Sequence, residues 1–319
     1  MPPPALMLAA AIVTALAAAA GCFLARGTTA VPAAAWAVVA AAALAGESAA
    51  LAVGWLTEPS AAAATRLIVA ALAVCPAASL LGAKRPQHGV WQFIVATLAG
   101  VLMLPAVSAV LVRPGSMPDV HMIERVLLVV LVVVGWLNFV ATRHGLAATL
   151  VAGGQLALIW PVVRGFADAT APAAWLDAVG GLAVACGAVL AVGQSLWRPA
   201  AAVERRGEVA GAIERPFLAL RETLGAAWTL RITERFNTIA ASKGWPCRLM
   251  FAGIVLDKGA AGGPWEREAV RCCRSILRRF VTPAWLGRQG GMRLQDAGTV
   301  DLTSSGPSPR SLASSRGQW

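Results

Sequence analysis

The stretch "RVLLVVLVVVGWLNFVATRHGLAATLVAGGQLALIW", residues 125–160, decides the fold class. Its two apolar runs are continuous, whereas the strands of a membrane barrel alternate apolar and polar residues. A helix needs roughly 20 apolar residues to cross the hydrocarbon layer of a bilayer, and each run comes close to that length. Because the link "TRHG" (142–145) is short, the stretch predicts two membrane-spanning helices joined in a tight hairpin.

The composition of the whole chain agrees with this interpretation. Hydrophobic residues make up 58% and charged residues 13% of the chain, and the mean hydropathy is +0.67. These values lie outside the range of soluble globular domains. The sequence therefore predicts an all-α polytopic membrane protein, a bundle of about seven helices with spans near 4–25, 34–56, 66–83, 90–112, 126–142, 146–163 and 174–197.

The orientation of the bundle follows from its basic residues. Nearly all of the net charge of +11 lies after residue 197, where the balance is +9 against +2 before it. The short loops on the two sides carry equal numbers of basic residues, so "RPAAAVERR" (198–206) decides for a cytoplasmic C-terminus. We expect a multi-pass protein of the cell (inner/cytoplasmic) membrane with its N-terminus outside. A rival interpretation, lipoprotein cleavage before Cys22, is disfavoured because "MPPPALM" (1–7) has no Lys or Arg.

Residues 199–286 are predicted to form a small basic α/β domain in the cytoplasm. A helix is expected over 207–242, with an interruption at Pro216, and a second one over 264–286 that ends before Pro283. Residues 247–257 are rich in strand formers, but one strand cannot form a sheet alone. It must therefore pair with another chain, or it is not a strand. Residues 287–319 are expected to be disordered.

Glu47, in "LAGESAALAVGW" (44–55), is the polar residue placed deepest in the predicted membrane block. A carboxylate at mid-membrane costs roughly 2.5–3.5 kcal/mol, so Glu47 should face the bundle interior or be protonated. No Lys, Arg or His lies at mid-depth in another predicted span, so no intramembrane salt bridge is expected. Asn138, Gln155 and carbonyls freed by proline are the available partners, and Glu47, Asn138 and Gln155 form the candidate ion or proton site. Asp177 is expected to reach the interface instead.

Catalytic, metal and cofactor sites find little support. "GESAA" (46–50) resembles the nucleophile elbow of α/β-hydrolases, but Ala50 replaces the second glycine and the motif lies within an apolar helix. The three histidines lie in loops or at the ends of spans, which argues against a catalytic base and against haem held between spans. The six cysteines are scattered and form no CxxC. No cofactor and no metal is expected.

Two groups of basic residues are candidate contacts for anionic lipid headgroups. Lys84, Arg85 and His88 lie in the loop 83–93, and Arg267, Arg271, Arg274 and Arg278 form one row of the last predicted helix. The neighbouring row of that helix is apolar, so it can lie in the headgroup layer or pack on its own domain with a solvated arginine edge. Nucleic-acid binding is not expected, because no known binding motif occurs.

The seventh span carries a stripe of small residues, Ala183, Gly187, Ala191 and Ser195. Such a stripe lets two helices approach closely, either within the protein or across a homo-oligomer.

These features support three candidate functions, which follow in order of preference. The first is a non-catalytic scaffold or regulatory membrane component with a basic cytoplasmic module. The second is a transporter or channel that uses Glu47 as its proton or cation site. The third is a membrane enzyme acting on lipid, for which the acidic and His residues are few and dispersed.

Overall fold

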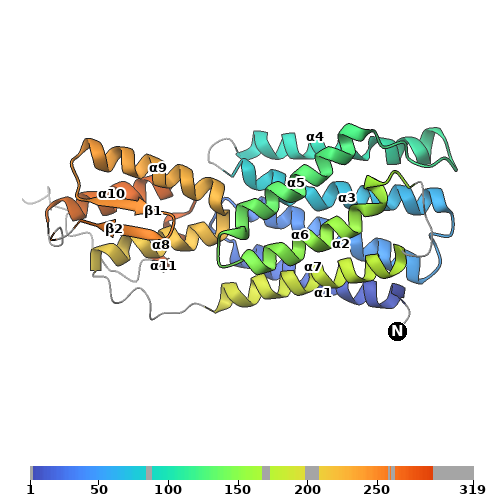
Figure 1. Cartoon of the computed structure of the whole chain (residues 1–319), viewed down its shortest axis with the longest axis horizontal. Helices are drawn as coiled ribbons and strands as arrows, with labels where there is room; N and C mark the ends of the chain where they lie inside the picture. Colours follow the sequence, from blue (N-terminus) through green and yellow to red (C-terminus); the bar gives the residue numbers. More distant parts are fainter. Residues whose placement is uncertain are drawn as a thin grey trace, which may run out of the picture.

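Seven long apolar helices form a bundle, and a small domain lies against one end of it (Figure 1). The computed structural model describes residues 3–83, 88–166, 173–197, 208–257, 259 and 263–289. The bundle consists of α1 (Pro3–Leu24), α2 (Val31–Ala52), α3 (Pro59–Leu81), α4 (His88–Val107), α5 (Met122–Val140), α6 (Gly145–Val163) and α7 (Ala173–Leu196), with α4 continuing as a π-helical turn, η1 (Ser108–Val112). All seven are long and apolar enough to cross a membrane, so the prediction of seven apolar helices of spanning length is confirmed.

Several helix ends differ from the prediction, among them the neighbouring ends of α2 and α3. Helix α2 ends at Ala52 rather than near residue 56, and α3 begins at Pro59 rather than near residue 66. Proline suits the first position of a helix, because its missing N–H would have no partner there and its φ is already helical. The earlier start places Arg66 about two turns inside α3 instead of in a loop.

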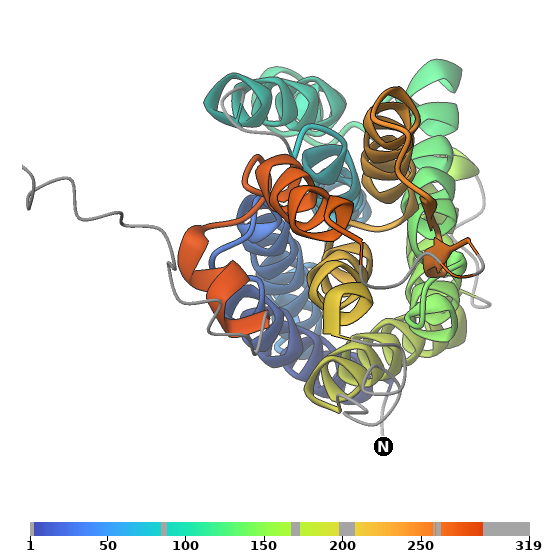
Figure 2. The same ribbon diagram turned by 90° about the vertical axis from the view of Figure 1, so that its left-hand side faces the viewer.

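The helices are arranged around α3, whose residues are the most buried of the bundle. Helices α1, α2, α3, α6 and α7 follow one another around the bundle, and α5 packs between α3 and α6. Helix α4 packs on the outer side of α3, as the view along the bundle shows (Figure 2). We call the end that faces the small domain the domain end and the opposite one the far end.

The small domain contains α8 (Glu208–Leu224), α9 (Ala226–Ser242), β1 (Cys247–Met250), β2 (Gly253–Leu256), α10 (Trp265–Leu277) and α11 (Pro283–Gln289). The predicted break at Pro216 is wrong: α8 continues through this proline, and the chain turns at Gly225 instead. Burial explains this, because Ile213, Phe217 and Leu220 on either side of Pro216 all lie in the domain core.

The predicted strand over 247–257 folds back on itself. Strands β1 and β2 pair antiparallel, with Met250 opposite Gly253, so the pairing lies within this chain and needs no partner. The buried side chains of Cys247, Leu249 and Ile254 face the same core as the helices. Residues 287–289, where disorder was expected to begin, belong to α11, and residues 290–319 lie outside the described residues.

Four sets of contacts join the domain to the bundle. A backbone bridge pairs Thr28, between α1 and α2, with Val281, between α10 and α11. In that bridge, Thr29 N donates to Phe280 O and Thr282 N donates to Gly27 O, each at 2.8 Å.

The other three contacts involve the ends of α3 and α5 and the link after α5. The Trp228 indole donates to Leu80 O at 2.8 Å, and the Asn138 amide bonds the joint between α8 and α9. Glu222 on α8 accepts a hydrogen bond from the backbone N–H of Arg143 at 3.1 Å.

Candidate functional site

A cluster of three charged side chains connects α2, α3 and α7, and two of them, Glu47 and Arg66, are buried while Asp177 is partly exposed. The Arg66 Nε donates to Glu47 Oε1 at 2.6 Å, while Nη1 and Nη2 of the same guanidinium bond the two carboxylate oxygens of Asp177 at 2.7 and 3.1 Å. Nη1 also reaches Leu158 O on α6 at 3.3 Å. Arg66 therefore links four helices through its one planar group, and we call Glu47, Arg66 and Asp177 the triad.

The triad corrects the prediction that no intramembrane salt bridge forms. Arg66 lies inside α3 because that helix begins at Pro59, and Glu47 lies little more than one turn before the end of α2. Asp177, which was expected to reach the interface, lies about one turn inside α7 and turns inward to the guanidinium. The ion pairs thus form near the far end of the bundle rather than at its middle.

The charges of the triad do not balance. Two carboxylates and one guanidinium leave one negative charge when all three groups are ionised. Glu47 is 3% exposed, and its Oε2 is buried without a hydrogen-bond partner among the described residues. An unbalanced charge in a low-dielectric interior is costly. A proton or a monovalent cation at Glu47 would remove that cost.

A cavity of about 930 Å³ enters the bundle from the domain end. Its walls are mostly Ala, Val and Leu from the domain-end halves of α1, α2, α3, α5, α6 and α7. Helix α8 lies over the centre of the bundle (Figure 2) and, with α11, contributes Arg215, Glu222 and Arg288 at the mouth. The cavity therefore lies between the bundle and the small domain, and both contribute to its walls.

The far end of the cavity is closed. Its deepest wall includes Ala73 on α3 and Gln155 on α6, where Gln155 Nε2 donates to Ala73 O at 3.0 Å. Arg66 lies two turns, or about 10 Å, further along α3. The triad and its bond to Leu158 O thus hold α2, α3, α6 and α7 together beyond the floor of the cavity.

The two other residues predicted for the Glu47 site lie elsewhere. Gln155 is at the cavity floor, and Asn138 is at the domain end of α5. The Asn138 amide donates to Leu224 O at 3.0 Å and accepts from Ala227 N at 2.9 Å. Neither side chain bonds Glu47, whose Oε1 accepts from Arg66 instead.

The predicted lipid contacts are only partly described. Lys84 and Arg85 lie outside the described residues, and His88 begins α4 with a side chain that is not described. The apolar row of α10, with Val270, Cys273 and Leu277, is buried in the domain core. Of the two alternatives for this helix, packing on its own domain is therefore the one observed.

The arginine row of α10 is the outer edge of the domain. Arg267, Arg271 and Arg278 are exposed and Arg274 is half-buried. Glu268 accepts a hydrogen bond from Lys243 at the C-terminal end of α9. Helix α9 is roughly 25 Å long, and its first residues contact the bundle. Arg267 and Arg271 consequently lie distant from the membrane helices (Figure 1).

The small-residue stripe of α7 is used inside this chain. A Cβ on Gly187 would meet the backbone and side chain of Ala147 and Val151 on α6, and Ala191 and Ser195 line the cavity. This placement favours the intramolecular alternative. Whether copies of the chain associate stays a prediction.

The described residues offer little for a metal or a thiol reaction. They contain no group of three or more His, Cys, Asp or Glu that could hold a metal ion. In the small domain, burial raises the pKa of the Cys247 thiol to about 11 and that of Cys273 to about 12. Both thiols are therefore protonated near neutral pH, whereas a reactive cysteine must be present as a thiolate.

No protein-family model, no curated protein sequence and no solved structure matches this chain.

Proposed function

We propose that this protein is a transporter of a small solute and that Glu47 binds a proton or a monovalent cation during its cycle. One observation carries the proposal: a cavity in the domain-end half of the bundle stops short of the far end, where a triad that carries one negative charge when fully ionised holds α2, α3 and α7 together. Alternating access requires a central space that is open to one side and closed to the other. Neutralising Glu47 would change how strongly the triad holds α2, α3 and α7 together.

We further propose the orientation that the basic residues favour, with the C-terminal domain in the cytoplasm and the protein in the cell (inner/cytoplasmic) membrane. The support is the concentration of positive charge after the last span. In this orientation the cavity faces the cytoplasm, and the triad is its gate on the outside. Pro76, which lines the cavity on α3, interrupts the helical hydrogen bonds close to this space and gives α3 a place to bend.

The test uses access to the cavity, because access can be measured whatever the solute is. Ala148 lines the cavity, so Ala148→Cys in a cysteine-free background reports its exposure to a membrane-impermeant maleimide. We expect labelling of the full-length protein in vesicles to change several-fold when the pH is lowered or sodium is added. Glu47→Gln should fix labelling at one rate under all these conditions.

Ser48→Ala is the matched control. Ser48 is the buried neighbour of Glu47 and only donates to Leu44 O within its own helix at 2.8 Å. The labelling of the Ser48→Ala variant should respond to pH and sodium as that of the parent does. A labelling rate that is independent of pH and sodium in the parent, and unchanged in Glu47→Gln, would refute the transporter proposal.

That negative result would favour the alternative proposal, a non-catalytic scaffold or regulatory membrane component. Its specific support is the exposed basic edge of the small domain, with Arg248, Arg267, Arg271 and Arg278. The interpretation as a lipid enzyme stays a prediction without an observation in its favour.

A further inference from the structure

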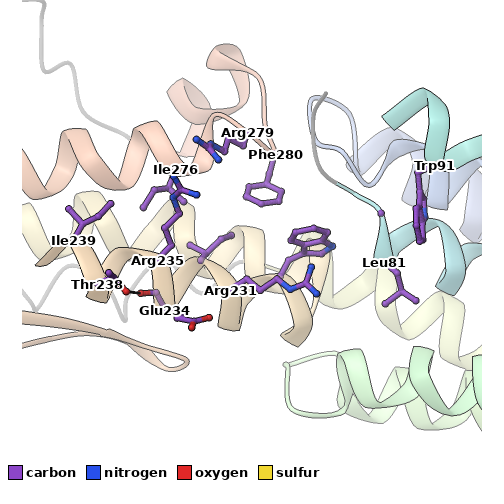
Figure 3. Close-up of a pocket in the computed structure, with 13 residues that line it drawn as sticks. Leu81, Trp91, Arg231, Glu234, Arg235, Thr238, Ile239, Ile276, Arg279 and Phe280 are labelled. Carbon is purple, nitrogen blue, oxygen red and sulfur yellow. Dashed lines mark hydrogen bonds between the residues drawn. The ribbon is translucent and has the colours of Figure 1, made fainter. Parts of the chain in front are cut away.

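A second pocket, of about 640 Å³, lies outside the bundle where the small domain meets α3 and α4. Its bundle side is formed by Leu81 and Gly82 at the end of α3 and by Trp91 near the start of α4 (Figure 3). Its domain side is formed by α9 and by the residues at and after the end of α10. This pocket shares only Leu81 with the cavity that the transport proposal uses.

Three arginines give the pocket its charge. Arg231 and Arg235 come from α9, and Arg279 follows α10, and all three side chains are exposed (Figure 3). None forms an ion pair with another described residue, although Arg231 lies over the Trp228 ring at 4.9 Å. Glu234 is the one acidic residue in the lining, so two positive charges are left over. Guanidinium groups without an acidic partner fit the oxygens of a phosphate.

The other lining residues place the pocket at the membrane surface. Leu81 is the last residue of a membrane-spanning helix, and Trp91 lies near the first residues of the next one. The indoles of Trp91 and Trp228 donate to Ala78 O and Leu80 O at 2.9 and 2.8 Å, which fixes both rings at the domain end of α3. Tryptophans concentrate at the depth of the lipid headgroups.

An apolar surface continues from the pocket along the bundle. Val90, Phe93 and Ile94 on α4 are exposed, with Phe93 at 72%, and these residues belong to a helix that lies on the outside of the bundle (Figure 2). A molecule that places a phosphate among the arginines can therefore lay hydrocarbon chains against α4.

We propose that this pocket binds the phosphate of an anionic phospholipid, with Arg231, Arg235 and Arg279 holding the headgroup and α4 contacting the acyl chains. This set shares no residue with the basic groups that the sequence indicated. The site makes the lipid a contact between the domain and the bundle, because its walls come from both.

The experiment compares two variants that remove equal charge. The first is Arg231→Gln/Arg235→Gln/Arg279→Gln. The control, Arg248→Gln/Arg267→Gln/Arg271→Gln, removes three exposed arginines outside the pocket. Binding of phosphatidylglycerol and of phosphatidylcholine to the full-length protein in neutral detergent is measured by native mass spectrometry, after both variants are shown to keep the parent's unfolding temperature.

We expect the pocket variant to bind phosphatidylglycerol at least about tenfold more weakly, since each basic residue near an anionic surface contributes about 1 kcal/mol. The control should stay within about twofold of the parent. Equal losses in both variants, or equal binding of the two lipids by the parent, would overturn the proposal. Displacement of phosphatidylglycerol by millimolar inorganic phosphate would also overturn it, because the occupant would then be a soluble anion.

Discussion

Arg66 is the residue on which the far end of the bundle depends. It is 7% exposed and lies between two carboxylates on different helices. Removing one member of a buried ion cluster leaves the remaining charges without compensation, which is more harmful than removing all of them together. The stability of the far end should therefore respond to the balance of charge and not to the number of hydrogen bonds.

We predict that Arg66→Met destabilises the protein by about 3–5 kcal/mol, because Glu47 and Asp177 would then face each other as buried anions. The triple variant Arg66→Met/Glu47→Gln/Asp177→Asn should recover most of that loss. Thermal unfolding in detergent, followed by circular dichroism, measures both. A triple variant less stable than Arg66→Met would contradict the charge-balance explanation.

The sequence contained Glu47, Arg66 and Asp177 but not their proximity. Glu47 could be recognised, because a carboxylate within an apolar run is unusual. Arg66 could not, because the apolar run begins just after it and hydropathy alone places it in a loop. Pro59 in "TEPSAAAATRL" (57–67) was the overlooked signal, since proline is frequent at the first position of helices. With that start, Arg66 becomes a residue that needs an acidic partner.

At the level of elements, the joint between α8 and α9 sets the position of the domain. Gly225 has φ 79° and ψ −168°, a conformation open only to glycine. The joint is held by Asn138, which bonds Leu224 O before it and Ala227 N after it. The Asn138 amide thus bonds one backbone group at the end of α8 and one at the start of α9, and it connects both helices to α5.

We predict that Gly225→Ala destabilises the protein by at least about 1 kcal/mol more than Gly244→Ala does. Both glycines have positive φ, but a Cβ at Gly225 would overlap the Asn138 amide, whereas one at Gly244 would meet no atom within 4 Å. The difference between the two unfolding free energies in denaturant measures the added cost of the glycine-only conformation at Gly225 together with the loss of the Asn138 joint. Equal losses would show that neither adds to the ordinary cost of a positive φ.

The elements of the small domain were only partly predictable. Pro216 looked like the helix break, but the buried side chains around it outweigh the loss of one backbone bond. Gly225 could not be recognised as the turn from the hydropathy pattern, because the segments on both sides of it have a helical pattern. The hairpin was missed because its turn, Phe251 and Ala252, lacks the Asn-Gly or Asp-Gly pair that marks such turns.

At the scale of the whole molecule, the junction of domain and bundle contains a buried histidine close to Glu222. His144, in the link between α5 and α6, is buried, with Nδ1 at 2.9 Å from Gln194 Oε1 on α7 and Nε2 at 4.0 Å from Glu222 on α8. Burial, the largest cause, lowers the pKa of His144, and nearby Arg143 lowers it further. The Gln194 bond and the Glu222 charge act in the opposite direction but do not prevail.

We predict that the protein loses stability as the pH falls below about 6.5. A lowered histidine pKa means that the unfolded chain takes up the proton first. The contribution of His144 is therefore complete above that pH and is lost as the pH decreases toward the folded-state pKa. Unfolding temperatures of the parent at pH about 7.5 and about 5.5 should differ more than those of His144→Gln. The same difference in both proteins would exclude His144 as the cause.

The overall architecture was the most predictable level, because seven apolar runs in one chain leave few alternatives in a bilayer. The docking of the domain on the bundle was not predictable, because it depends on single backbone carbonyls such as Leu80 O and Leu224 O. Every residue carries such a carbonyl, so the sequence does not mark these two. The cavity was equally hidden, because its walls are Ala, Val and Leu like the lipid-facing surface.

The bridge between Thr28 and Val281 also has a consequence for how the protein is made. Residues 27–29 leave the ribosome early, and their backbone partners at 280–282 leave it after all seven spans. Until then the turn between α1 and α2 can bond only water or lipid headgroups. A nascent chain with every span inserted is consequently still unfinished at its domain end, which can be completed only after residue 282 has left the ribosome.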